Sequence, residues 1–355
     1  MKKKIMIIMG ALFTLNAQAD NIVDFHGDKQ QSSVIMSKYA KDVSTSTRAL
    51  YELLRNNFNN SDKAFEKQIE PLLQKRFALV EAIKKEGNYS FVDFQTVFYP
   101  NDKNIYTTIE VIKANDSSRL KFVNAAVKQP EKKQPKRKKD LIDQRIEFDN
   151  YEMQLMQQGK IKPGKYECPV YHCVTGYAEP RFKPYLAKFN TGAVRQKKLI
   201  LDTLNHDPVP ERRAAAAFMV GHFTTPDAVF AALLPHVNDS DEGVRNNVMR
   251  VIGSTMDKAQ KYDLDLTPFI NMLNSPYGSD RNKALYVLLY ATHYEPNKKI
   301  IARQAGAKLI DLLALKQPNN HDTAYQVLKE ISGEHFSDQD ITGWKKWMAK
   351  QINSA

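Results

Sequence analysis

A repeated spacing in the second half of the chain limits the possible folds more than any other feature. Asp207 precedes Arg213 by six residues, and Asp239 precedes Arg245 by the same interval. The two arginines are 32 residues apart, and Arg281 lies 36 residues beyond the second. Such a period is typical of repeat architectures, in which each unit buries its apolar face against its neighbours.

Each unit has the composition of a helix pair. Ser240 and Asp241 can cap one helix, and Thr225 followed by Pro226 can start its partner. Val244, Val248, Val251 and Ile252 form one apolar stripe on the helix that follows Asp241. The repeat copies are predicted at residues 204–221, 237–253, 273–289 and 318–333. The partner helices are predicted at residues 227–236, 265–273 and 299–315.

On these residues the sequence resembles the HEAT-repeat family over residues 181–355, and more loosely the armadillo-type superhelix. Residues 331–352, with Phe336, Trp344 and Trp347, resemble the closing segment of bacterial HEAT-like proteins. The resemblance implies a C-terminal α-solenoid whose extended surface binds a protein or peptide. It also implies that the repeated Asp and Arg residues, Asp207, Arg213, Asp239, Arg245 and Arg281, join turns within and between units.

The first 19 residues have the pattern of a secretory signal peptide. Three lysines precede an apolar run from Ile5 to Leu15, and the segment ends in Ala17-Gln18-Ala19. We expect cleavage between Ala19 and Asp20, which lowers the formal net charge from +12 to +9. The apolar run is too short to span a bilayer as an anchor. The sequence therefore predicts an exported protein, periplasmic or secreted, with no transmembrane segment.

A small α+β domain is predicted ahead of the repeats. Residues 20–46 are polar and are expected to form a flexible N-terminal arm. Residues 47–127 follow, with two helices, the second kinked or split at Pro71, and a β-hairpin at residues 91–99 and 105–112. A third strand is expected near residues 119–123. The predicted fold is therefore mainly α, a solenoid with a small N-terminal α+β domain.

Residues 128–140 have the composition of a linker. They hold seven basic and two acidic residues, two prolines and no aromatic residue, so they cannot bury a core. We interpret the run as a solvated spacer, with an anionic lipid, polysaccharide or nucleic acid contact as the alternative. That contact would use Lys132, Lys133, Lys136, Arg137, Lys138 and Lys139.

A linker helix and a cysteine loop are predicted at residues 141–180, and the helix is expected to end at Gly159. Cys168 and Cys173 are the two cysteines of the chain, with His172 between them. In an oxidising compartment they favour a local disulfide. A metal site lacks closely spaced further ligands, and a Cys–His nucleophile pair on so short a loop is poorly oriented. His206, His222 and His236 lie near predicted helix ends, where capping or surface roles are expected.

These features favour a non-catalytic scaffold or adaptor that binds a protein partner outside the cytoplasm. No glycine-rich phosphate loop, nucleophile elbow or HExxH motif occurs, so we predict no catalytic, cofactor or metal residues. The alternatives are an enzyme acting on envelope polymers near Cys168 and His172, or a binder of anionic polymers. Some HEAT-like folds, such as the alkylpurine DNA glycosylases, bind DNA. Export and the ratio of 23 basic to 18 acidic residues in residues 181–355 argue against nucleic acid.

Overall fold

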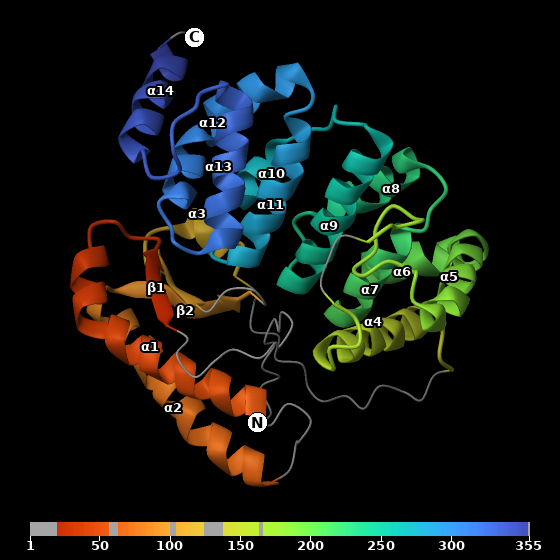
Figure 1. Cartoon of the computed structure of the whole chain (residues 1–355), viewed down its shortest axis with the longest axis horizontal. Coiled ribbons are helices and arrows are strands. Elements are labelled where there is room, and N and C mark those ends of the chain that lie inside the picture. The colour runs from red at the N-terminus through yellow and green to blue at the C-terminus, as the bar shows by residue number, and fades with distance from the viewer. Residues whose placement is uncertain (1–19, 57–62, 100–103, 124–137, 163–165, 354–355) are drawn as a thin grey trace. The chain divides into compact units, whose positions relative to one another are not determined.

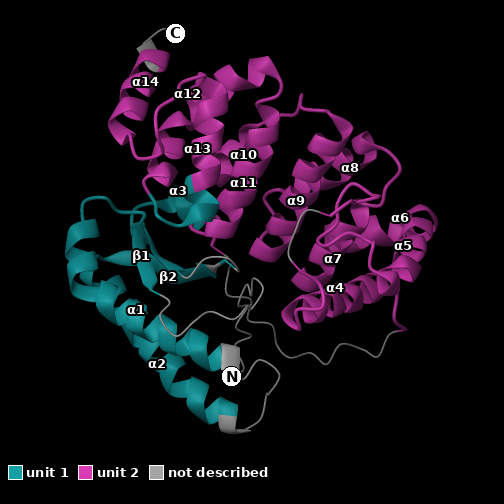
Figure 2. Ribbon diagram, in the orientation of Figure 1, with its two compact units in different colours: residues 1–120, 315–321 teal, residues 121–314, 322–355 magenta. Residues whose placement is uncertain are grey.

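The computed structural model describes residues 20–56, 63–99, 104–123, 138–162 and 166–353. Within them the protein is mainly helical, with fourteen α-helices and one three-stranded sheet (Figure 1). The chain divides into two compact units (Figure 2). Unit 1 contains residues 1–120 and 315–321, and unit 2 contains residues 121–314 and 322–355. The predicted signal peptide and its Ala19 lie outside the described residues, whereas Asp20 is exposed.

The sheet of unit 1 has the strand order β1-β3-β2. The predicted hairpin is present, because β2 (Tyr89–Phe98) pairs antiparallel with β3 (Ile105–Lys113). The third strand is not at residues 119–123, where a short helix, α3 (Ser117–Leu120), lies instead. It is β1 (Asn21–His26), which pairs parallel with β3. The predicted flexible arm was therefore wrong, because its first residues complete the sheet and bury Val23.

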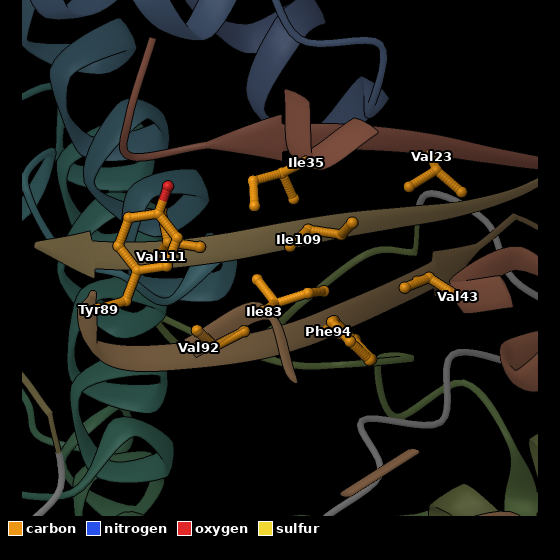
Figure 3. Packing of buried hydrophobic residues seen from close by; sticks show 9 residues of the cluster. All are labelled: Val23, Ile35, Val43, Ile83, Tyr89, Val92, Phe94, Ile109 and Val111. Atoms are coloured by element: carbon orange, nitrogen blue, oxygen red, sulfur yellow. The ribbon is translucent and has the colours of Figure 1, made fainter. Parts of the chain in front are cut away.

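Two long helices cover the sheet of unit 1. They are α1 (Ser32–Asn56), which contains the rest of the predicted arm, and α2 (Lys63–Glu86). Helix α2 continues through Pro71, so the predicted split does not occur. Ile35 and Val43 of α1 and Ile83 of α2 pack against the inward side chains of the strands (Figure 3). This burial gives the sheet the partner that an isolated hairpin lacks.

Residues 315–321 belong to unit 1, although the sequence places them within the repeat domain. The buried carboxylate of Asp24 in β1 accepts hydrogen bonds from the backbone N–H groups of Lys316 (2.6 Å) and Gln317 (3.1 Å). The Tyr99 hydroxyl accepts from the N–H of Asn319 at 2.9 Å. A segment far along the chain is therefore tied to the edge of the sheet.

Unit 2 begins with the predicted linker helix, α4 (Leu141–Gln157). Asp140 caps it by accepting from the N–H groups of Ile142 and Asp143, and the chain turns away at Gly159 with φ +67°. A 3₁₀ turn (Pro180–Phe182) leads into α5 (Lys183–Arg195) and α6 (Lys197–His206). The ring of Phe148 in α4 packs against Phe182 and Phe189, which joins α4 to α5.

The predicted repeat copies contain helices α7 (Pro210–Val220), α9 (Glu242–Ala259), α11 (Gly278–Ala291) and α13 (Pro318–Ser332). Between them lie α8 (Pro226–Leu233) with a 3₁₀ turn (Leu234–His236), α10 (Thr267–Met272) and α12 (Glu295–Leu313). Helix α9 packs between α7 and α11. Thr225 and Asp241 cap α8 and α9 as predicted, and the apolar stripe of α9 is fully buried. Helix α8 packs against α7 and α9, and α10 packs against α11.

The last helix, α14 (Ile341–Asn353), packs against α12. Trp344 is fully buried, and its ring contacts those of Phe336 and Trp347 at centroid distances of 5.3 and 6.2 Å. Its indole N–H donates to the Ser337 carbonyl at 2.9 Å. The three aromatic residues predicted as a cap therefore pack together.

Candidate functional site

The predicted repeat arginines form a ladder that joins successive helices. Arg213 of α7 donates to the Asp207 carbonyl at 2.9 Å, which closes the turn before its own helix. Its other nitrogens donate to both carboxylate oxygens of Asp239, in the turn before α9, at 2.8 and 3.0 Å. One side chain therefore fixes a turn and links two units.

The same geometry recurs one unit later. Arg245 of α9 donates to the Asp239 carbonyl at 2.8 Å and to the Asp280 carboxylate at 2.7 and 3.0 Å. In the third unit Ser275 replaces the turn aspartate, and Arg281 donates to its carbonyl at 2.8 Å. The Ser275 hydroxyl donates to Asp280 at 2.6 Å. The third unit therefore has its aspartate at residue 280, inside α11, instead of in the turn before the helix. Arg245 still binds this carboxylate, so the second and third units remain linked.

The ladder also extends back to α4, through a residue that the sequence analysis missed. Arg212 donates to the Asp207 carboxylate at 2.6 Å and to Asp143 and Asp140 of α4 at 2.6 and 2.8 Å. An arginine of α7 therefore binds carboxylates at the start of α4, and a second arginine of α7 binds the carboxylate in the turn before α9. The sequence signal was Arg212, the first arginine of the Arg212-Arg213 pair, to which the repeat pattern gave no role.

The cysteine loop is pinned against this row of helices. Cys168 and Cys173 form the predicted disulfide, with their Cα atoms 5.7 Å apart. Lys258 of α9 donates to the carbonyls of Cys168 and Val170 at 2.6 and 2.9 Å. The N–H of Tyr171 donates to the Gly221 carbonyl at 3.0 Å. Because both sulfurs are bonded to each other, neither can serve as a metal thiolate or a nucleophile in this state.

His172, inside the disulfide ring, is buried between α7 and α9. Its Nδ1 lies 3.0 Å from the Ser254 hydroxyl, and its ring lies 5.0 Å from that of Phe218. Burial, with the positive charges of Arg250 and Arg145, holds the pKa of His172 well below its usual value. The imidazole is therefore neutral at pH 7.

His222 is buried as well, so its expected capping or surface role was wrong. Its Nδ1 lies 2.8 Å from the Asn190 amide oxygen, and its Nε2 lies 3.3 Å from the Tyr177 hydroxyl. Burial, with the charge of Arg145, lowers the pKa of His222 to about 3. Arg145 itself pairs with Asp149 at 2.8 Å. His222 therefore serves as a neutral member of a buried network, which its position at the end of α7 did not indicate.

A pocket of about 410 Å³ opens beside the disulfide loop. Its walls come from the loop, from α5 and from the end of α7, and include Pro169, Val170, Asn190, Val194, Phe223 and Lys258. Lys258 already donates to two loop carbonyls, and the His222 ring that lines the pocket is held by Asn190 and Tyr177. The pocket is mostly apolar, and its Lys258, Asn190 and His222 side chains hydrogen-bond within the chain.

The basic residues of the predicted linker are mostly outside the described residues. Lys132, Lys133, Lys136 and Arg137 fall there, and Lys138 and Lys139 are exposed. Lys139 pairs with Glu147 of α4. The anionic contact predicted for this segment remains a prediction.

The sequence analysis did not identify a pair of neighbouring cations, Arg250 of α9 and Lys283 of α11. Arg250 and Lys283 are half-buried on neighbouring helices. Burial lowers the pKa of Arg250, and burial with the charge of Arg250 lowers the pKa of Lys283 to about 7. Charged residues in a helix are solvated by default, so the sequence carried no signal for this pair.

No protein-family model, curated protein or solved structure matches this chain. In the described segments no helix is both long and apolar enough to cross a bilayer. The same segments hold no group of three or more His, Cys, Asp or Glu side chains arranged to bind a metal ion.

Proposed function

We propose that this protein is an exported, non-catalytic scaffold that binds a protein partner through a HEAT-like stack of helix pairs. The observation that carries the proposal is the arginine ladder. Arg213 and Arg245 connect α7, α9 and α11 through one repeated set of contacts, and Arg212 adds α4 through its contacts with Asp140 and Asp143. A row of helices joined in register presents the same positions of successive units side by side, which suits an extended ligand.

The disulfide supports export, because such bonds persist in oxidising compartments. The signal-peptide pattern of residues 1–19 points to the same route. The aromatic cap at Trp344 supports a finite stack, since a terminal repeat must close its open apolar face.

Crosslinking capture in the cell envelope and culture medium of the source bacterium, followed by mass spectrometry, tests this function. The exported chain is compared with a variant lacking residues 128–137, because a partner of the helix row is retained without the basic run. This deletion keeps Asp140, which caps α4 and binds Arg212. Recovery of only linker-dependent anionic material would contradict the proposal.

Two sets of substitutions then identify the layer that binds. Asn246→Ala with Tyr290→Phe changes half-buried positions of α9 and α11, and Asp227→Ala with Asn271→Ala changes exposed positions of α8 and α10. Phenylalanine keeps the ring that packs against Tyr286. We expect one pair to reduce capture at an unchanged melting temperature while the other leaves capture intact. Equal losses from both pairs would argue against an extended surface on one layer.

A further inference from the structure

Arg250 of α9 and Lys283 of α11 lack the acidic partners that the ladder arginines have. No carboxylate among the described side chains forms an ion pair with either residue. The Lys283 ammonium donates to the Asn282 side-chain carbonyl at 2.8 Å. Gly253 of α9 lies against the Tyr286 ring of α11, and Arg250 and Lys283 each lie three residues before these contacting positions, on neighbouring turns of the two helices. The charge of Arg250 accordingly contributes to the lowered pKa of Lys283. Half-burying two like charges side by side is unfavourable unless something else offsets it.

Two buried nitrogen atoms of neighbouring side chains also lack a hydrogen-bond partner, since His172 contacts Ser254, one helical turn after Arg250. Within the described part of the chain, no atom hydrogen-bonds the Arg250 Nε or the His172 Nε2, although both atoms are buried. The Nδ1 of His172 faces the Ser254 hydroxyl, which lies 3.4 Å from the Tyr286 hydroxyl. When Ser254 donates to Nδ1, the imidazole proton resides on Nε2, which is then a donor without an acceptor. An unsatisfied buried donor costs roughly 1–3 kcal/mol.

These groups come from three segments that the fold holds firmly. The disulfide and Lys258 fix the loop that carries His172, while the ladder contact of Arg245 with Asp280 fixes α9 against α11. The cations and donors are therefore positioned before any ligand arrives, which reduces the entropy lost on binding.

We propose that Arg250, Lys283 and the Nε2–H of His172 form an anion-binding site that receives a carboxylate side chain of an acidic peptide segment. The proposal rests on the proposed protein-binding function and names the chemistry of the partner. A carboxylate has the acceptor oxygens that a guanidinium, an ammonium and an imidazole N–H can share.

The charges around the site favour a single carboxylate over a continuous polyanion. The Glu152 carboxylate of α4 is near enough to raise the pKa of Arg250. Two turns further along α9 and α11, burial, Tyr286 and the Asp257 carboxylate together raise the pKa of Tyr290. A nucleic acid backbone laid along α9 and α11 would meet negative charge beyond the cations, whereas one glutamate or aspartate would not.

The test measures binding of a fluorescein-labelled tetraglutamate peptide to the full exported chain by fluorescence anisotropy at pH 6.5 and low salt. Tetraglutamine is the uncharged control. We expect saturable binding of tetraglutamate alone, weakened roughly tenfold or more by Arg250→Met or by Lys283→Met. Arg250→Lys should retain part of the affinity, and Lys308→Met, at an exposed position of α12, should leave it unchanged.

Three results would overturn the site. The first is equal affinity of the Arg250→Met, Lys283→Met and Lys308→Met proteins for tetraglutamate. The second is displacement of the peptide by equimolar inorganic phosphate, which assigns the site to phosphate. The third is tighter binding of a single-stranded oligonucleotide that depends on Arg250, which assigns the surface to nucleic acid.

The same variants separate this site from the proposed function. A protein partner that Arg250→Met captures as well as the unmodified chain does would refute the site and leave the scaffold function standing. Arg250-dependent tetraglutamate binding without any captured partner would support the site and count against the scaffold function. Because Arg250 and Lys283 are unpaired, both Met variants should melt at or above the temperature of the unmodified protein.

Discussion

Helix α9 carries two arginines, five residues apart, whose surroundings differ completely. Arg245 is 1% exposed and donates to the Asp239 carbonyl, the Phe122 carbonyl and the Asp280 carboxylate. Arg250 has no such contact within the described residues, and its Nε is buried without an acceptor. The charge of Arg245 is paired within the fold, whereas the charge of Arg250 is available to the carboxylate of a partner. The comparison separates charges that build the molecule from charges that it offers to a partner.

Of the substitutions considered, replacing Arg245, whose charge is paired within the fold, should lower the free energy of unfolding most. Arg245→Met leaves the buried carboxylate of Asp280 without its counter-ion, and removing one partner of a buried pair costs about 3–5 kcal/mol. We expect a loss of that size in the free energy of unfolding, measured by urea denaturation followed by circular dichroism. A loss below about 1 kcal/mol would mean that the ladder does not hold the helices together.

Acid should destabilise the fold through His222, because the unfolded chain takes up a proton on this imidazole while the folded chain keeps it neutral. The pKa of His222 falls from 6.5 when unfolded to about 3 when folded, so the unfolded chain binds more protons between these values. The stability that His222 contributes is complete above pH 6.5 and is lost as pH falls toward 3. At pH 5 the loss is about 2 kcal/mol.

Urea denaturation at pH 7 and pH 5 measures this loss. The buried His172, whose pKa is also lowered, adds to it in the same direction. In His222→Gln the difference between the two pH values should shrink, because the glutamine does not titrate. An unchanged difference would show that other groups cause the acid sensitivity.

Removing the disulfide should lower both the stability of the fold and its affinity for tetraglutamate, with a smaller loss of stability than Arg245→Met causes. Replacing Cys168 and Cys173 by serine opens a ring of six residues, and the loop-entropy relation gives a loss of about 2 kcal/mol. The measurement is thermal unfolding of the variant beside the oxidised protein. We also expect weaker tetraglutamate binding, since His172 loses its fixed position. Unchanged stability and binding would show that Lys258 and the Gly221 carbonyl hold the loop without the disulfide.

The smallest expected effect is at the start of α9. Asp241→Ala removes the side chain that accepts from the Val244 N–H, at a cost of about 1 kcal/mol in unfolding free energy. Ser240→Ala is the matched control, because Ser240 is exposed and does not cap the helix. Urea denaturation of the two variants should separate these roles, and equal losses would remove the distinction.

Local patterns predicted much of the fold. The period of Asp207, Arg213 and Arg245 located the helices of the repeat copies, and turn and cap residues placed their starts. The hairpin and the disulfide followed from composition and spacing. These features depend on residues close together in sequence or on a repeated interval, which is what a pattern search detects.

Long-range pairing could not be found in this way. Strand β1 pairs with β3, more than 80 residues away, and Asp24 binds the backbone near Lys316. Helix α1 did carry a signal, since Ile35, Tyr39 and Val43 recur at helical spacing, but the polar residues around them obscured it. Arg250 and Lys283 gave no signal, because only the packing of α9 beside α11 brings them together.

The most direct test of the account measures Arg245→Met and Arg250→Met side by side for urea stability and tetraglutamate affinity. We predict opposite outcomes. Arg245→Met should lose about 3–5 kcal/mol of stability, whereas Arg250→Met should keep its stability and lose binding roughly tenfold or more. If Arg250→Met is as unstable as Arg245→Met, or binds tetraglutamate as tightly as the unmodified chain, the division between structural and ligand-binding charge on α9 is contradicted.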